Sequence, residues 1–201
     1  ILEDIEKEIK KLNFSKKGTF KNISPKCLLE TLDVSGPILL NLWNEGILKD
    51  CVYPSILKLA EVSPVFKKEN PQLAKNYRPV SVLPTVTKIF ERLMQKQLNE
   101  YINQFLSPIL CGYRTGFSTQ TALLSLIEKW KDIIDSKGYA GAVLMDLSKA
   151  FDTINYELLT SKLHAYGFGK DALKLILSYL KHRKQRVKGI GGGPGSNFRF
   201  L

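Results

Sequence analysis

The chain has 201 residues, 44% of them hydrophobic and 24% charged, a composition typical of a folded domain that excludes a disordered or fibrous chain. No apolar run approaches the roughly 18 residues that a membrane-spanning helix needs, so we expect no membrane partner. The net charge of +11 favours a polyanionic partner such as nucleic acid, although a basic surface without any partner is the simpler alternative.

The first fifty residues predict three short helices. Apolar residues repeat at helical spacing over residues 2–12. Ser24 stands before a proline, which is a typical helix start and predicts a helix over residues 26–32. Ser35 is predicted to cap a third helix over residues 37–49. This part has no residue pattern that points to chemistry, so residues 1–48 are interpreted as a helical N-terminal extension.

A basic β-hairpin is predicted next. Residues 58–66 alternate as in a strand, and Pro64 indicates an edge position because proline cannot donate to a sheet ladder. Residues 67–71 have turn composition, and residues 77–83 are again rich in strand-forming side chains.

Two longer amphipathic helices follow the hairpin. The first begins after Pro84, and the second is capped by Ser118 or Thr119. Six side chains of the second helix are predicted to face a core: Ala122, Leu123, Leu126, Ile127, Trp130 and Ile133.

A compact apolar run, residues 140–145, ends abruptly at Asp146. We interpret it as a buried strand that presents one carboxylate at its C-terminal end, which is a rigid support for a catalytic group. Three later elements are predicted: a turn and helix over 148–163, a helix over 171–180 and a strand starting at 186–188. The Gly-rich stretch after residue 188 is interpreted as a flexible tail or a damaged end.

Basic residues accumulate towards the end of the chain. After Leu158 the only acidic side chain is Asp171. The basic side chains there are Lys162, Lys170, Lys174, Lys181, Arg183, Lys184, Arg186, Lys188 and Arg199. This segment could hold a phosphate backbone, although such a charge run is more often a solvated face.

The cysteines carry little information. Cys27, Cys51 and Cys111 are odd in number and widely spaced, and neither histidine lies near one of them in the sequence. A zinc site or disulfide scaffold is not expected, and a reducing intracellular compartment, nucleus or cytoplasm, is the default. Because the chain begins Ile1-Leu2 without an initiator methionine, we interpret it as part of a longer gene product.

Three segments together resemble the reverse transcriptases of non-LTR (LINE-type) retrotransposons. They are Val65-Phe66-Lys67-Lys68 with Asn76-Tyr77-Arg78-Pro79-Val80-Ser81, then Gly112-Tyr113-Arg114-Thr115-Gly116-Phe117-Ser118-Thr119, and Leu144-Met145-Asp146-Leu147-Ser148-Lys149-Ala150-Phe151-Asp152. Their order and spacing agree with the fingers motifs and the first palm motif of that family. The resemblance covers roughly residues 49–188.

The resemblance implies an α/β (α+β) fold, namely the fingers and a partial palm of a right-hand polymerase, with helices packed on a small antiparallel sheet. It divides the chain into a fingers-like region at 49–137, the start of a palm at 138–188 and a Gly-rich tail at 189–201. The implied activity is RNA-directed DNA polymerisation by two-metal nucleotidyl transfer. The implied partners are an RNA template, a DNA primer and a deoxynucleoside triphosphate, and the oligomeric state is left open.

The resemblance also implies roles for residues of the palm motif. Asp146 is the catalytic carboxylate and, with the carbonyl of Leu147, a ligand of Mg²⁺ or Mn²⁺, which accept such hard oxygens. Phe151 packs beneath the incoming sugar and excludes a 2′-hydroxyl. Asp152 is expected to fix the turn or to cap the following helix.

The fingers motifs and the basic end supply the remaining candidates. Arg78, Lys67 and Lys68 are expected to face the triphosphate, since an arginine fork binds phosphate oxygens bidentately. Arg114 is expected to touch the template backbone or to brace the fingers. The candidates for nucleic-acid binding at the basic end are Lys181, Arg183, Lys184 and Arg186.

The carboxylates leave a second function open. No adjacent pair of aspartates occurs in the 201 residues, and one carboxylate cannot hold two metal ions. The chain alone is therefore expected to be inactive. The alternative is a catalytically inactive nucleic-acid-binding remnant of such an enzyme. A helical interaction module unrelated to polymerases would require the three motifs to be coincidental.

Overall fold

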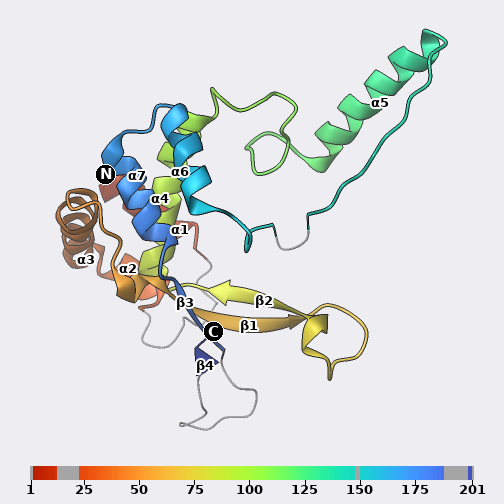
Figure 1. The fold of residues 1–201 in the computed structure, drawn as a ribbon. Coiled ribbons are helices and arrows are strands. Elements are labelled where there is room, and N and C mark those ends of the chain that lie inside the picture. Colours follow the sequence, from red (N-terminus) through yellow and green to blue (C-terminus); the bar gives the residue numbers. More distant parts are fainter. Residues whose placement is uncertain (1, 13–22, 148–149, 188–198, 201) are drawn as a thin grey trace. The chain divides into compact units, whose positions relative to one another are not determined.

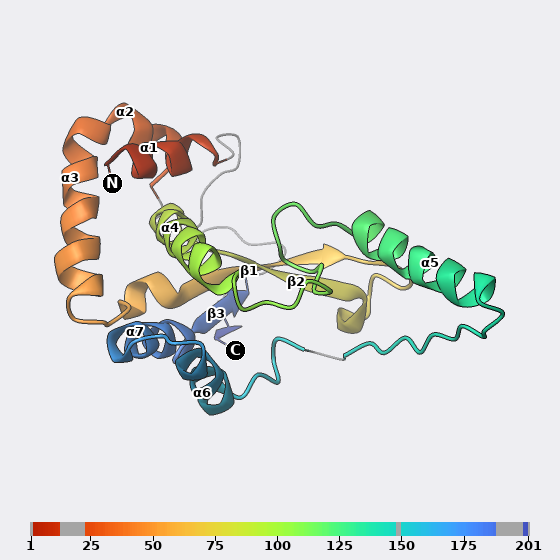
Figure 2. The same cartoon turned by 90° about the horizontal axis from the view of Figure 1, so that it is seen from above.

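The structure is a computed structural model that describes residues 2–12, 23–147, 150–187 and 199–200. Its contacts divide the chain into two compact units. Unit 1 comprises Ile1–Asn99 and Tyr156–Leu201, and unit 2 comprises Glu100–Asn155. Figures 1 and 2 show the elements of both units in two views.

Unit 1 combines helices with a small sheet, so the mixed α/β class is confirmed. Its helices are α1 (Leu2–Lys10), α2 (Pro25–Glu30), α3 (Leu32–Asn41), the π-helical η1 (Leu42–Leu48), the short 3₁₀ turns η2 (Ser55–Lys58) and η3 (Ala74–Asn76), most of α4 (Thr85–Ile102), α6 (Tyr156–Ala165) and α7 (Lys170–Leu180). Its strands are β1 (Leu59–Phe66), β2 (Tyr77–Val82), β3 (Lys184–Val187) and β4 (Arg199–Phe200).

The start of α2 is as predicted, but the start of α3 is not. Ser24 caps α2, because its hydroxyl accepts the backbone N–H of Cys27 at 3.1 Å. Helix α3 begins five residues before Pro37, so Ser35 lies inside the helix and is not its cap. A proline inside a helix costs one backbone hydrogen bond. The burial of Leu39 from the same helix in the core offsets that cost.

The sheet has the strand order β2-β1-β3-β4. Strands β1 and β2 form the predicted antiparallel hairpin, whereas β1 and β3 are parallel. The prediction of an antiparallel sheet therefore holds for the β1–β2 and β3–β4 pairs and is wrong for β1–β3. Strands β1 and β3 are connected through several helices, and a crossover of that length permits parallel pairing.

Pro64 lies at an edge position of the sheet, as predicted. Strand β3 pairs with β1 only as far as Val62, so Pro64 lies where β1 has β2 as its only neighbour. In that pairing it is opposite Pro79, which has no N–H to donate either.

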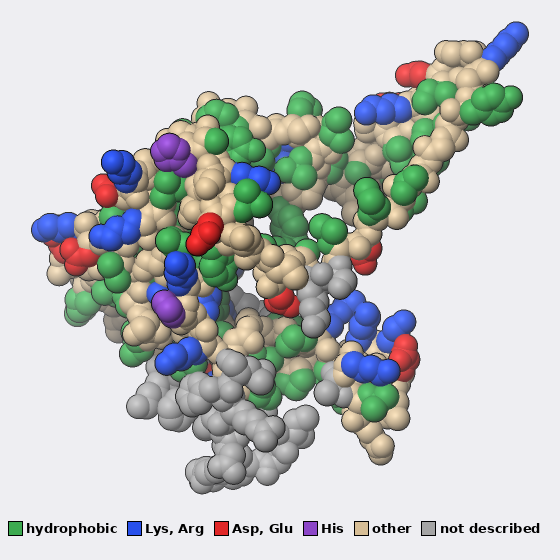
Figure 3. Space-filling model, in the orientation of Figure 1, with side chains coloured by type: hydrophobic (Ala, Val, Ile, Leu, Met, Phe, Trp, Pro, Cys, Tyr) green, Lys and Arg blue, Asp and Glu red, His purple; other side chains and the backbone are tan. Residues whose placement is uncertain are grey.

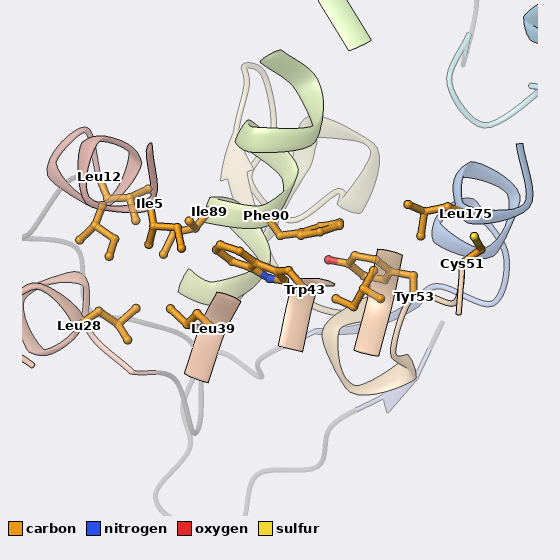
Figure 4. Close-up of a cluster of buried hydrophobic side chains, with 12 residues drawn as sticks. Ile5, Leu12, Leu28, Leu39, Trp43, Cys51, Tyr53, Ile89, Phe90 and Leu175 are labelled. Carbon is orange, nitrogen blue, oxygen red and sulfur yellow. The ribbon is translucent and has the colours of Figure 1, made fainter. Parts of the chain in front are cut away.

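An aromatic row forms the centre of the unit 1 core (Figure 4). The Phe90 ring lies between Trp43 and Tyr53, with ring centroids 5.8 and 5.5 Å apart. The backbone N–H of Tyr53 donates to the Ser178 hydroxyl at 2.9 Å, which fastens α7 to the segment before β1. The row thus joins η1, the residues before β1, α4 and α7 in one hydrophobic core.

Helix α1 is held on α4 by buried apolar residues and by charge. The Asp4 carboxylate lies 3.5 Å from the Lys96 ammonium, and Glu8 lies 3.8 Å from the Arg92 guanidinium. The charge of Lys96 lowers the pKa of Asp4. The N-terminal helices are thereby part of unit 1.

Unit 2 contains one complete helix among its described residues, α5 (Thr119–Asp135). The Ser118 hydroxyl caps it by accepting the N–H of Thr121 at 3.2 Å, as predicted. The prediction that its apolar residues face a core is wrong, because α5 has no buried residue. Within the described part of unit 2 the helix has no other complete helix or strand to pack against.

The end of the chain is described only in part. Strand β3 confirms the strand predicted near Arg186, and β4 pairs with it through two residues. The Gly-rich residues 188–198 lie outside the described residues. Among the described helices, none has the length and apolar character that a bilayer crossing requires.

Lys58 provides a test of the unit 1 core. Its side chain is only 7% exposed, and burial lowers its pKa, with a further decrease from nearby Arg183. Both effects disfavour the charged ammonium group, because it is removed from water and lies near another positive charge. We therefore expect Lys58→Met, which keeps the length of the side chain, to raise the melting temperature at pH 7 by about 2–4 °C.

The contribution of Lys58 to the stability of the fold changes with pH in a predictable direction. Between the lowered pKa of Lys58 and its ordinary value of 10.5, the unfolded chain binds more protons than the folded chain. Stability due to Lys58 therefore rises with pH through that window, and the advantage of Lys58→Met shrinks. Melting by circular dichroism at pH 7 and pH 10 measures both effects, with Lys162→Met on exposed α6 as control. A variant that melts below the wild type at pH 7 contradicts this account.

Candidate active site

The turn between β1 and β2, residues 67–76, is here called the hairpin tip. Its three lysines, Lys67, Lys68 and Lys75, are all exposed. Figure 3 shows Lys and Arg side chains gathered at this end of the hairpin. Within the tip, Glu69 is the one acidic residue, and it lies 3.6 Å from the Lys68 ammonium. The tip therefore presents a net positive charge.

Hydrogen bonds from asparagine side chains fix the backbone of the hairpin tip. The Asn70 side-chain oxygen accepts the N–H of Gln72 at 2.8 Å, and the Asn76 amide donates to the Asn70 carbonyl at 2.9 Å. The Tyr77 hydroxyl donates to the Pro71 carbonyl at 2.8 Å. The tip is thus a turn held by internal hydrogen bonds, and its three lysines are exposed.

Arg78 lies on β2 directly opposite Val65 and is exposed. Side chains alternate along a strand, so Arg78 shares a face with Val65 and, two residues further, with Lys67. The rings of Phe66 and Tyr77, which form the neighbouring pair, contact each other with centroids 5.5 Å apart. The structure therefore brings the predicted triphosphate residues together at one end of the hairpin.

Asp146 lies in unit 2 and is exposed. The strand predicted before it is wrong: residues 139–147 form neither helix nor strand. Val143, Leu144 and Met145 are 86, 92 and 87% exposed. A strand exists only when a neighbour satisfies its backbone groups, and no described strand pairs with this segment.

Asp146 and the Leu147 carbonyl offer two hard oxygen ligands. Mg²⁺ takes six oxygens in octahedral geometry, and a pair of ions requires several carboxylates. The described residues contain no group of three or more acidic, histidine or cysteine side chains placed to hold a metal. These residues therefore fit one part of a divalent-metal site and do not complete it.

Phe151 lies in the turn at residues 150–153. It is 71% exposed, and the Thr153 hydroxyl fastens the turn by donating to the Ala150 carbonyl at 3.3 Å. Asp152 lies in the same turn, four residues before α6 begins at Tyr156, so it does not cap that helix.

Arg114 is half-buried and makes its contacts within unit 2. Its guanidinium donates to the carbonyls of Ser107 at 3.0 Å and Leu110 at 3.4 Å. The same group lies 4.4 Å from the centroid of the Phe117 ring. Of the two roles expected for Arg114, these contacts fit a brace of the loop before α5.

The basic end of unit 1 contains two kinds of residue. Lys181 and Lys184 are exposed. Arg183 lies 3.6 Å from Glu91 and stacks on the Tyr179 ring, with its guanidinium 4.6 Å from the ring centroid. The Tyr179 hydroxyl donates to Glu91 at 2.6 Å, and burial raises the pKa of this phenol, so it stays protonated.

Arg186 forms an ion pair with Glu61 directly across the parallel β1–β3 pairing. The two side chains are 12 and 18% exposed, which makes this pair an internal fastening of the sheet. The sequence groups Arg186 with the nucleic-acid candidates because its partner is 125 residues away. A neighbouring acid in the sequence, the usual signal of an ion pair, is absent.

The comparisons with known proteins identify the family. Residues 66–195 match the family model described as reverse transcriptase (RNA-dependent DNA polymerase). This is more than half of the chain, and the chain therefore belongs to the reverse transcriptase family. The resemblance to reverse transcriptases of non-LTR retrotransposons is confirmed.

Relatives among known proteins come from mobile elements and introns. The chain is 29% identical over 190 residues to a probable RNA-directed DNA polymerase from transposon BS of Drosophila melanogaster, covering 93% of this chain and 21% of that protein. It is 24% identical over 203 residues to the RNA-directed DNA polymerase from mobile element jockey of Drosophila funebris, covering 100% and 22%. It is 28% identical over 162 residues to a putative COX1/OXI3 intron 1 protein of Saccharomyces cerevisiae, covering 80% and 18%. The chain spans about a fifth of the length of these relatives.

The Glu61–Arg186 pair allows a test of which basic residues stabilise the fold and which are only exposed at the surface. Removing one partner of a buried ion pair leaves an uncompensated charge, so Arg186→Met should lower the free energy of unfolding by about 3 kcal/mol. Lys184→Met, two residues away on the same strand but exposed, should change it by less than about 0.5 kcal/mol. Urea unfolding of both variants measures the difference, and equal stabilities would contradict the internal role of Arg186.

Proposed function

We propose that this chain forms the fingers and the first palm segment of a retrotransposon-type RNA-directed DNA polymerase. The observation that carries the proposal is the family match over residues 66–195, which includes the hairpin tip, Asp146 and Phe151. The proposed partners are an RNA template, a DNA primer and a deoxynucleoside triphosphate.

The hairpin tip and Arg78 bind the triphosphate in this proposal. A net positive and exposed cluster attracts the phosphates, and the arginine fork orients them through paired hydrogen bonds. The exposure of Lys67, Lys68 and Arg78 supports this role, because none of them is buried in the hairpin.

Asp146 and the Leu147 carbonyl are the proposed ligands for Mg²⁺ or Mn²⁺. When bound, such ions activate the primer hydroxyl and neutralise charge on the triphosphate. The remaining carboxylates must come from residues other than those described here. Phe151 forms a wall at the sugar, where an apolar ring without a hydrogen-bonding group disfavours a 2′-hydroxyl.

Nucleic acid is proposed to bind the exposed lysines of the basic end, Lys181 and Lys184. Arg183 and Arg186 support this surface from within, through Glu91 and Glu61. In this proposal the template and primer contact the exposed ammonium groups of Lys181 and Lys184.

Binding of RNA to this chain should depend strongly on salt. If about five phosphates are contacted, the logarithm of the affinity should fall with the logarithm of salt concentration at a slope of about −4. Lys184→Ala should reduce the magnitude of that slope by about 1, whereas Tyr139→Ala should leave it unchanged. Filter-binding titrations from 50 to 300 mM salt test this, and an affinity that is insensitive to salt would defeat the proposed surface.

Asp146 should be indispensable to polymerisation by the longer protein that contains this chain. Asp146→Asn keeps the size of the side chain but removes the charge that the metals require. Extension of a primer on an RNA template should fall about a thousandfold or more, because each 1.36 kcal/mol lost is a factor of ten. Asp152→Asn should cost far less rate. Single-turnover extension measures the loss of rate. The affinity for RNA is measured in parallel and should stay nearly constant.

The chain alone is the control for this experiment. It provides too few carboxylates for two ions, so the 201 residues by themselves should give background extension only. If Asp146→Asn retains activity while Asp152→Asn abolishes it, the assigned roles are wrong. If neither the longer protein nor any of its variants extends a primer, the proposed function itself is wrong.

A further inference from the structure

Two exposed aromatic rings meet in unit 2. The rings of Tyr113 and Phe151 contact each other edge to face, with centroids 6.1 Å apart and planes at 85°. Tyr113 is 90% exposed, so the contact is not part of a hydrophobic core. An edge-to-face arrangement is the favoured geometry of an aromatic pair, because the positive edge of one ring meets the negative face of the other.

The backbone of Tyr113 is strained. Its φ of 59° lies in the left-handed region, which a residue with a Cβ rarely adopts. Burial of the ring does not compensate for this conformation, since the ring is exposed. Uncompensated strain at an exposed aromatic residue is typical of a functional position.

Each ring lies beside local hydrogen bonds of its own segment. The loop that carries Tyr113 is braced by Arg114, whose guanidinium binds the carbonyls of Ser107 and Leu110. The turn that carries Phe151 is fastened by the hydrogen bond from Thr153 to Ala150. The two rings therefore meet from segments that are each fixed locally, although they are 38 positions apart in the sequence.

We propose that Tyr113 is a positioning residue that holds the Phe151 ring in the orientation that rejects a ribonucleotide. This inference rests on the proposed function, in which Phe151 is the wall at the sugar. A wall rejects a 2′-hydroxyl only if it cannot rotate away, and an exposed phenylalanine ring has little packing to restrain it. The edge-to-face contact with Tyr113 supplies that restraint, and Arg114 transmits rigidity to it from the loop.

The test measures selection between sugars in the longer, active protein. Single-nucleotide incorporation with dNTP and with the matching rNTP gives the ratio of the two kcat/KM values. Tyr113→Ala should lower the preference for dNTP by about 2- to 10-fold, the range expected for the loss of one aromatic pair. The loss should come from better use of rNTP, with kcat for dNTP nearly unchanged.

Three further variants make the result specific. Tyr113→Phe keeps the ring and should retain the preference for dNTP. Phe151→Ala should lower that preference more than Tyr113→Ala, and the double variant should lower it no further than Phe151→Ala alone, because both act through one ring. Tyr139→Ala removes a fully exposed tyrosine of the same unit and should have no effect.

The failures of the two proposals are distinguishable. If the wild type extends primers but Tyr113→Ala keeps the full preference for dNTP, the inference is wrong and the proposed function stands. The same holds if Tyr113→Ala lowers the use of dNTP and rNTP equally, since Tyr113 then contacts substrate or template directly. If the wild type incorporates neither nucleotide, the proposed function fails and this inference fails with it.

Discussion

Two divalent ions need more carboxylate oxygens than one aspartate supplies, and in the proposed function Asp146 is the one carboxylate assigned to them. The residue lies at the end of an apolar segment that has no paired strand among the described residues. The exposed Val143, Leu144 and Met145 are side chains that a sheet would ordinarily bury. In the proposed function, residues other than Asp146 supply the remaining carboxylates.

Unit 1, in contrast, has its own hydrophobic core and its own internal ion pairs. The row of Trp43, Phe90 and Tyr53 joins the N-terminal helices to α4 and α7, and the Glu61–Arg186 pair joins β1 to β3. Some of the positively charged side chains of the chain thus form ion pairs within the fold. The part that remains exposed, at the hairpin tip and at Lys181 and Lys184, is what a phosphate-bearing partner would meet.

The sequence predicted elements whose signals are local and failed where the outcome depends on distant partners. The cap at Ser24, the β1–β2 hairpin and the cap at Ser118 follow from neighbouring residues and are confirmed. The strand before Asp146 and the buried face of α5 require partners that local patterns do not specify. The parallel β1–β3 pairing and the internal role of Arg186 join residues about 125 positions apart, which no local pattern reveals.

The most direct test of the central claim is to locate the bound metal on the longer protein. Fe²⁺ can replace Mg²⁺ in the complex with primer, template and dNTP, and added hydrogen peroxide, reduced by the bound Fe²⁺, gives hydroxyl radicals that cut the nearby backbone. If Asp146 is a metal ligand, the cuts should fall within a few residues of Asp146, excess Mg²⁺ should suppress them and Asp146→Asn should abolish them. Cuts confined to other segments, unchanged in that variant, would contradict Asp146 as a metal ligand.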